Sequence, residues 1–139
     1  MDDLARPRDR WTTVLATLMG LMALSNFWKP FAQRLAPDSD AGFVLFGTRL
    51  HGAANAVIGP LFGVLLAAYA YGVWTLRRWV APLAVAYAGY VIANLTLFTL
   101  NTPADQMPPA LGMIAYAAVA VGVSGVGAYS LWSRREKLR

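Results

Sequence analysis

The sequence contains no cysteine, a single histidine and few charged residues. Without cysteine, disulfide bonds, thiolate nucleophiles and cysteine-ligated metals are excluded. The lone His51 cannot form a metal or haem site by itself, because stable sites take several ligands. The sequence therefore predicts no bound metal and no cofactor.

Charged residues make up 14% of the 139 residues, whereas an ordinary soluble domain carries about 25%. Hydrophobic residues make up 58%, and the mean hydropathy is +0.46. A soluble domain of this length could not hide so much apolar surface, so membrane lipids are the expected surroundings. The net charge of +5 would suit nucleic acid, but the basic residues form short clusters between apolar runs, which is typical of membrane topology. We therefore expect no nucleic-acid partner.

Four apolar runs divide the chain, at about 11–28, 43–76, 80–100 and 110–132. Each run approaches or exceeds the roughly 20 residues that a helix needs to cross a bilayer. The second run begins at Gly52 or as early as Phe43. Helices and closed barrels satisfy backbone polar groups in lipid, and these runs lack the alternation of barrel strands. The predicted fold is an all-α membrane protein, a single domain (1–139) built as a four-crossing antiparallel helix bundle. Its outer loops are predicted at about 29–42 and 101–109.

Two features surround the first run. Its basic start and apolar middle resemble a signal peptide, but Asp2, Asp3 and Asp9 dilute the basic charge, so we expect an uncleaved helix. After it, prolines interrupt the first outer loop and leave room for a short amphipathic helix on the membrane surface, at about 31–35.

Lysine and arginine residues predict the orientation. Nine fall on one side of a four-crossing chain: Arg6, Arg8, Arg10, Arg77, Arg78, Arg134, Arg135, Lys137 and Arg139. The other side carries Lys29, Arg34 and Arg49. By the positive-inside rule, both termini are cytoplasmic. The expected location is the cell membrane as a multi-pass protein, and the alanine-, arginine- and valine-rich, lysine-poor composition favours a bacterial inner membrane.

Polar side chains gather at the predicted outer ends of the helices. On a helical wheel, Thr48, His51 and Asn55 share one face of the second run, with Arg49 at its edge. Polar residues inside a membrane are costly and are therefore candidates for function. The predicted ligand pocket is lined by Asn26, Arg49, His51, Asn55, Tyr87, Tyr90, Asn94 and Asn101. Hydrogen bonding between transmembrane helices explains the same residues equally well.

Small residues at four-residue spacing predict close helix contacts. They are Gly59 and Gly63 in the second run and Ala118, Gly122 and Ser124 in the fourth. Such faces pack within one bundle or against another subunit. The fourth run is the better candidate for a partner face, because it has small residues on more than one side.

The predicted function is that of a small non-catalytic integral membrane protein, an accessory or structural subunit of a larger membrane complex. Its partners are then other membrane subunits or further copies of the chain. No catalytic residue is assigned, because none of the runs contains an Asp or Glu for acid–base chemistry. Two alternatives remain open. One is a binder or carrier of a small amphipathic or anionic ligand in the outer polar pocket, and the other is a membrane enzyme on a lipid-like substrate with His51 as base.

Overall fold

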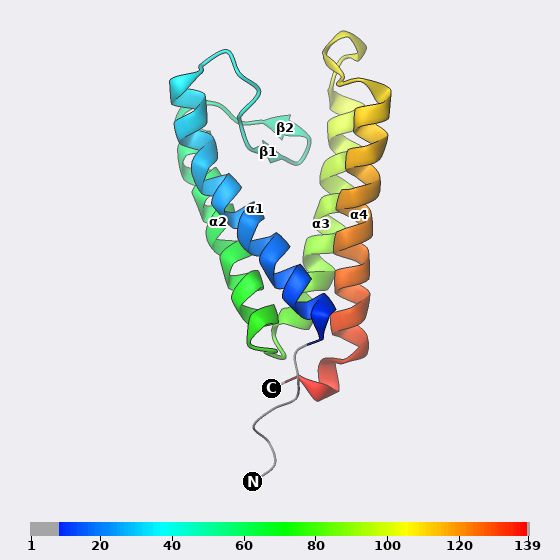
Figure 1. Cartoon of the computed structure of the whole chain (residues 1–139). Helices are drawn as coiled ribbons and strands as arrows, with labels where there is room; N and C mark the ends of the chain where they lie inside the picture. The colour runs from blue at the N-terminus through cyan, green and yellow to red at the C-terminus, as the bar shows by residue number, and fades with distance from the viewer. Residues whose placement is uncertain (1–8, 139) are drawn as a thin grey trace.

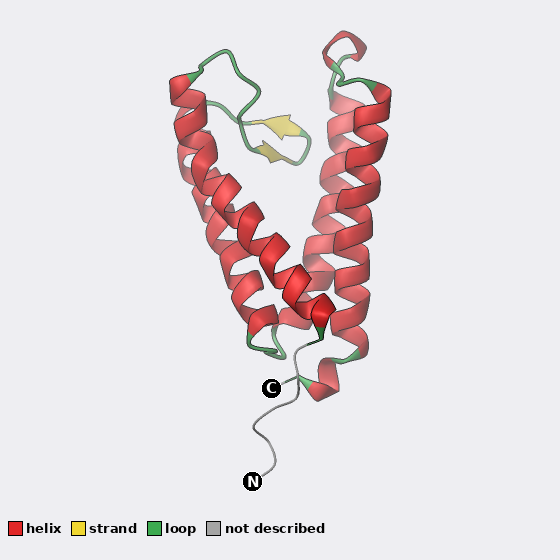
Figure 2. Ribbon diagram, viewed as in Figure 1, coloured by secondary structure: helices red, strands yellow, loops and turns green. Residues whose placement is uncertain are grey.

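The computed structural model describes residues 9–138 and is almost entirely helical over that range (Figures 1 and 2). Its long helices are α1 (Arg10–Leu35), α2 (Gly52–Trp74), α3 (Val80–Asn101) and α4 (Ala110–Ser133). Strands β1 (Val44–Leu45) and β2 (Thr48–Arg49) form a short hairpin, and the 3-10 helices η1 (Ala104–Gln106) and η2 (Arg135–Lys137) follow α3 and α4. We call the end of the molecule that holds the hairpin the hairpin end. The turn end is the opposite end, where residues 75–79 join α2 to α3.

Three helices within residues 9–138 are long and apolar enough to cross a membrane, namely α2, α3 and α4. Helix α1 is also long, at 26 residues, but its last three turns carry Asn26, Lys29 and Arg34. The prediction of a helical chain with membrane-compatible helices is therefore confirmed. Residues 1–8 and 139, which hold three of the arginines used to predict the orientation, lie outside the described residues.

Helix α1 is longer than predicted. It continues through Pro30 to Leu35, so residues 29–35 are its last two turns rather than part of a loop with a separate surface helix. A proline inside a helix removes one intrahelical hydrogen bond, here the bond to the carbonyl of Asn26. Helix α2 comes close to this carbonyl at Gly59, where an added Cβ would lie 3.4 Å from the oxygen. The small residue lets α2 pack against the interrupted stretch of α1.

Helix α2 begins at Gly52, and the alternative start at Phe43 is wrong. The residues between them fold into the antiparallel hairpin instead. Its register pairs Val44 with Arg49 and Leu45 with Thr48. Each strand has only two residues, too few to produce the alternating pattern by which a strand is recognised in sequence.

The turn of the hairpin has an unusual backbone. Phe46 and Gly47 have φ angles of 45° and 79°, and positive φ at both central residues is what a type I′ turn requires. Because Thr48 lies in β2 and His51 precedes α2, the predicted helical face of Thr48, His51 and Asn55 does not exist. Of these three residues, Asn55 is the one on the helix.

The helices form two antiparallel pairs. Helix α1 packs along α2, and α3 packs along α4. The pairs meet at the turn end and diverge toward the hairpin end, where the hairpin lies between them (Figure 1). Helices α2 and α3 are consecutive and antiparallel, as predicted, but they contact each other at few positions. The predicted bundle is therefore two helical pairs joined mainly at one end.

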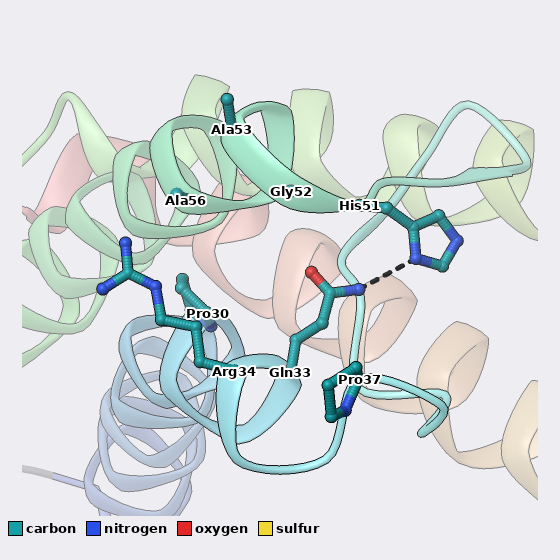
Figure 3. Close-up of a pocket in the computed structure, with 8 residues that line it drawn as sticks. All are labelled: Pro30, Gln33, Arg34, Pro37, His51, Gly52, Ala53 and Ala56. Atoms are coloured by element: carbon teal, nitrogen blue, oxygen red, sulfur yellow. Dashed lines mark hydrogen bonds between the residues drawn. The ribbon is translucent and has the colours of Figure 1, made fainter.

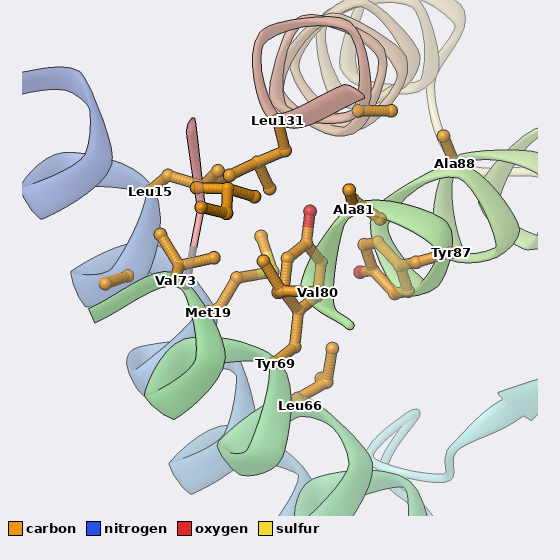
Figure 4. Close-up of a cluster of buried hydrophobic side chains, with 14 of the residues drawn as sticks. Leu15, Met19, Leu66, Tyr69, Val73, Val80, Ala81, Tyr87, Ala88 and Leu131 are labelled. Atoms are coloured by element: carbon orange, nitrogen blue, oxygen red, sulfur yellow. The ribbon is translucent and has the colours of Figure 1, made fainter. Parts of the chain in front are cut away.

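The main hydrophobic core lies near the turn end, where all four helices contribute to it (Figure 4). Its most deeply buried side chains are Leu15, Met19, Leu66, Tyr69, Val73, Val80, Ala81, Ala84 and Leu131. At the adjoining turn, the Trp79 ring covers Gly72, where an added Cβ would lie 2.7 Å from Cη2 of the indole. This packing fixes the point from which the two pairs diverge.

Helices α1 and α4 also meet at the turn end. The indole N–H of Trp11 donates to Ser130 Oγ at 3.1 Å. Arg134 donates to the carboxylate of Asp9 at 2.8 Å. At Gly127, an added Cβ would lie 3.2 Å from the Leu15 side chain, so a small residue is needed for this approach.

Candidate functional site at the hairpin end and on α4

The hairpin is attached to both helical pairs by asparagine side chains. The backbone N–H of Phe43 donates to Asn55 Oδ1 of α2 at 2.9 Å. The backbone N–H of Gly47 donates to Asn94 Oδ1 of α3 at 3.0 Å. Both asparagines belong to the predicted pocket wall. Their carbonyl oxygens satisfy backbone donors that the short strands leave unpaired, so both side chains hold the hairpin in place.

The hairpin tip presses directly against α3. A Cβ at Gly47 would lie 2.4 Å from the carbonyl carbon of Leu97. Together with the φ angle of 79°, this contact leaves space for glycine alone. The hairpin therefore bridges the gap between α2 and α3 by backbone contact at one side and by the Asn55 hydrogen bond at the other.

Aromatic rings fill the space beneath the hairpin. The Phe62 ring of α2 lies 4.8 Å from Phe43 and 5.0 Å from Tyr90, measured between ring centroids. The Tyr90 hydroxyl donates to the carbonyl of Val44 in β1 at 3.2 Å. Tyr87 continues the cluster toward the core, with its centroid 6.3 Å from Phe62. Tyr87 and Tyr90, predicted as pocket residues, therefore pack between the two helical pairs.

A polar network links α1 to the start of α2. Asn55 Nδ2 donates to Gln33 Oε1 at 2.8 Å, and Asn55 is completely buried. This bond orients the Gln33 amide so that its Nε2 faces His51 Nδ1 at 2.9 Å and the carbonyl of Leu50 at 3.4 Å. Because an amide nitrogen is a donor, His51 Nδ1 accepts, and a neutral ring then carries its proton on Nε2.

Two further predicted pocket residues are engaged elsewhere. Arg49 hydrogen-bonds the backbone carbonyl of Asp40, and its Nε lies 3.8 Å from the Asp40 carboxylate. Asn26 accepts a hydrogen bond from Lys29 Nζ at 3.0 Å, and the Lys29 ammonium sits 5.1 Å from the centroid of the Phe43 ring. Arg49 thus ties the preceding loop to the hairpin, and Asn26 positions a lysine over an aromatic ring.

A pocket of about 480 Å³ opens between the last turns of α1 and the first turns of α2 (Figure 3). It is lined by Pro30, Gln33, Arg34, Pro37, His51, Gly52, Ala53 and Ala56. His51 is the one member of the predicted set that lines it. Asn101 is exposed at the end of α3 and takes no part in it.

Sequence reasoning missed Gln33 and Arg34 as site residues. Both lie in the stretch predicted as an outer loop with room for a short surface helix, and the structure places them on the last turns of α1. One feature of the sequence does point to a longer helix: no glycine ends the helix between the first apolar run and these two polar residues. Their spacing to His51 depends on the extended α1, which the pattern did not predict.

The small residues divide into two groups. Gly59 and Gly63 are buried in the α1–α2 contact, where a Cβ at Gly63 would lie 3.2 Å from the Ala23 carbonyl oxygen. Ser124 is buried and donates to the Ala120 carbonyl of its own helix at 2.6 Å.

Gly122 and Ala118 are different, because both are exposed. An added Cβ at Gly122 would meet nothing within 4 Å. On α4 they share a strip with Ala115 and Gly125, within a wedge of roughly 80° at 100° per residue. We call these four exposed residues the α4 strip. The buried side of α4, which includes Leu131, faces the other way.

Within residues 9–138, no three His, Cys, Asp or Glu side chains come together in a way that could hold a metal ion. Comparisons with protein-family models, with curated proteins and with solved structures find no match to this chain.

Proposed function

We propose that this chain is a four-crossing protein of the cell membrane that works, without catalysis, as an accessory or structural subunit of a larger membrane assembly. In this proposal a transmembrane helix of another subunit, or of a second copy, packs against the α4 strip. The observation that carries the proposal is the strip itself, which is exposed and has open space around Gly122.

Helix α1 supplies the fourth crossing in this proposal. It runs beside α2, which is long and apolar enough to span a bilayer. Its charged residues Lys29 and Arg34 lie toward the hairpin end, where long side chains reach the headgroup region. The 26 residues of α1 correspond to about 39 Å at 1.5 Å per residue, which exceeds a hydrocarbon core of about 30 Å.

The distribution of charge supports a cytoplasmic turn end. The described lysines and arginines at that end are Arg10, Arg77, Arg78, Arg134, Arg135 and Lys137. The hairpin end carries Lys29, Arg34 and Arg49. An excess of basic residues on one side orients that side toward the cytoplasm. Together with the composition, this favours a bacterial inner membrane.

The exposed strip supports a helix–helix contact for a physical reason. In lipid, helices associate through close backbone approach and van der Waals packing rather than through hydrophobic burial. Leu111 and Tyr129 lie on the same face of α4, before and after the strip along the helix, and are 81% and 76% exposed. A partner helix could enter between them and contact the α4 backbone at Gly122 and Gly125.

Leucine substitution tests this proposal. Gly122→Leu fills the strip without touching the rest of the molecule, because its surroundings are open. We expect the variant to weaken the native complex about tenfold, or about 1.4 kcal/mol, as measured by the mass of the particle in mild detergent. Gly89→Leu is the matched control, since Gly89 of α3 also has open surroundings.

The outcomes separate clearly. Loss of the complex with Gly122→Leu and its retention with Gly89→Leu support the proposal. If the wild-type protein is a monomer in mild detergent and in native membranes, the proposed subunit role is wrong.

A further inference from the structure

The lining of the pocket between α1 and α2 carries positive charge and no carboxylate. Arg34 and His51 stand on its two sides, with Gln33 between them (Figure 3). The rest of its lining is apolar or backbone, from Pro30 and Ala56 among others. Among the described residues that line it there is no Asp or Glu. Arg34 therefore brings a positive charge to the rim that no carboxylate of the lining balances, and a negatively charged group is the complement that it lacks.

Arg34 is the described cation of the hairpin end that has no partner. Within residues 9–138 its guanidinium makes no hydrogen bond or ion pair, in contrast to Lys29 and Arg49, which are both engaged. A guanidinium presents five N–H donors in a planar fork that matches a phosphate or carboxylate. Asp40 of the preceding loop is paired with Arg49, and neither Asp38 nor Asp40 lines the pocket.

His51 adds a second donor of fixed orientation. Its Nδ1 accepts from Gln33, whose own orientation is set by Asn55. The Nε2–H is therefore left free to donate to a ligand in the neutral ring. This chain of hydrogen bonds starts at a completely buried asparagine, so the imidazole is positioned by the folded core and not only by the surface loop.

The two helices that form the pocket also carry exposed apolar side chains. Trp28 and Phe31 of α1 stack with ring centroids 6.2 Å apart, and both are more than half exposed. On α2, Val57 and Leu61 are likewise exposed, at 58% and 63%. Tryptophan at this depth is typical of the boundary between headgroups and acyl chains. The acyl chains of a ligand whose anionic group enters the pocket would thus have exposed apolar surface on both helices that form it.

We infer that this pocket binds the phosphate of an anionic phospholipid headgroup, with Arg34 and His51 as donors and the acyl chains lying along the exposed apolar residues of α1 and α2. Its volume of about 480 Å³ is sufficient for a glycerophosphate group, since ligand pockets measure about 300–1,000 Å³. The inference is independent of the α4 strip, because the two surfaces share no residue.

The test compares lipid affinity in the purified full-length protein. Phosphatidylglycerol and phosphatidylcholine are added separately to the protein in detergent, and binding is followed by the rise in Tm, since a ligand that binds the native state stabilises it. We expect phosphatidylglycerol to raise Tm more than phosphatidylcholine. Arg34→Gln should weaken the response to phosphatidylglycerol about tenfold or more, because it removes charge-assisted hydrogen bonds.

The matched control is Arg77→Gln, which removes an exposed arginine at the opposite end of the molecule. Arg34 has no partner within the described residues, so its substitution should leave the lipid-free Tm unchanged. The proposed site would be overturned if phosphatidylglycerol raised the Tm of Arg34→Gln as much as that of the wild type. It would also be overturned if Arg77→Gln lost as much of this rise as Arg34→Gln. Inorganic phosphate is tested alone as well. If it reproduces the whole response at similar concentrations, the lipid is overturned as the ligand in favour of a soluble phosphate.

Discussion

Asn55→Leu tests whether the hairpin is held by the buried amide. Leucine has the same branched side-chain skeleton as asparagine but cannot accept the Phe43 N–H or donate to Gln33 Oε1. An unpaired buried N–H costs about 1–3 kcal/mol, and losing the second bond adds about 1 kcal/mol. We therefore expect the free energy of unfolding to fall by about 2–4 kcal/mol.

Two assays measure this loss. Unfolding in mixed micelles, followed by tryptophan fluorescence, gives the global free energy. Trypsin cleavage at Arg49 reports local release of the hairpin, and a loss of 2 kcal/mol corresponds to roughly thirtyfold faster cleavage when opening is in rapid equilibrium. Asn101→Leu is the control, because Asn101 is exposed and surface changes stay within about 0.5 kcal/mol. Asn55→Leu behaving like this control would refute the reasoning.

Three further outcomes follow from individual contacts. Gly47→Ala should destabilise the protein by about 3 kcal/mol or more, because Gly47 has a positive φ and touches the α3 backbone. Gly52→Ala should cost about 1–2 kcal/mol in the same unfolding assay, because Gly52 has a φ of 55° but open surroundings. The hydrogen bond from Arg134, together with that from the Trp11 backbone, lowers the pKa of Asp9 below its ordinary value of 3.8. The Asp9–Arg134 pair thus stabilises the fold above pH 3.8, and this stabilisation is lost as the pH falls below that value. Asp9→Asn should remove the resulting decline in Tm at acid pH. Tyr69→Phe should leave Tm unchanged or raised, since the buried Tyr69 hydroxyl has no partner within residues 9–138.

The helical segments were predictable because the length of an apolar run can be read from the local sequence alone. Helix α4 ends at Ser133, close to the predicted bound, whereas α2 begins at Gly52 and the predicted start at about residue 43 is wrong. The end of α1 was not predictable in the same way. Pro30 is normally read as a helix end, but here the helix continues because α2 packs beside it at Gly59.

The candidate site was predictable in residue type rather than in arrangement. The amides of Asn55 and Asn94 were identified as unusual, and both are used by the hairpin. The hairpin itself has strands of two residues and a Phe-Gly turn, so neither periodicity nor the common Asn-Gly signal marks it. The contact of Gln33 with Asn55 joins residues 22 positions apart, and it depends on the relative placement of two helices that composition does not encode.

The proposed subunit role is tested most directly by cysteine crosslinking in native membranes. The chain has no cysteine, so Gly122→Cys introduces a single thiol on the α4 strip, and Gly89→Cys introduces one on α3. We predict that a short bifunctional or oxidative crosslinker gives one adduct of defined mass with Gly122→Cys, from a second copy or a partner subunit, and none with Gly89→Cys. A Gly122→Cys protein that stays monomeric under conditions in which its thiol is reactive would contradict the account.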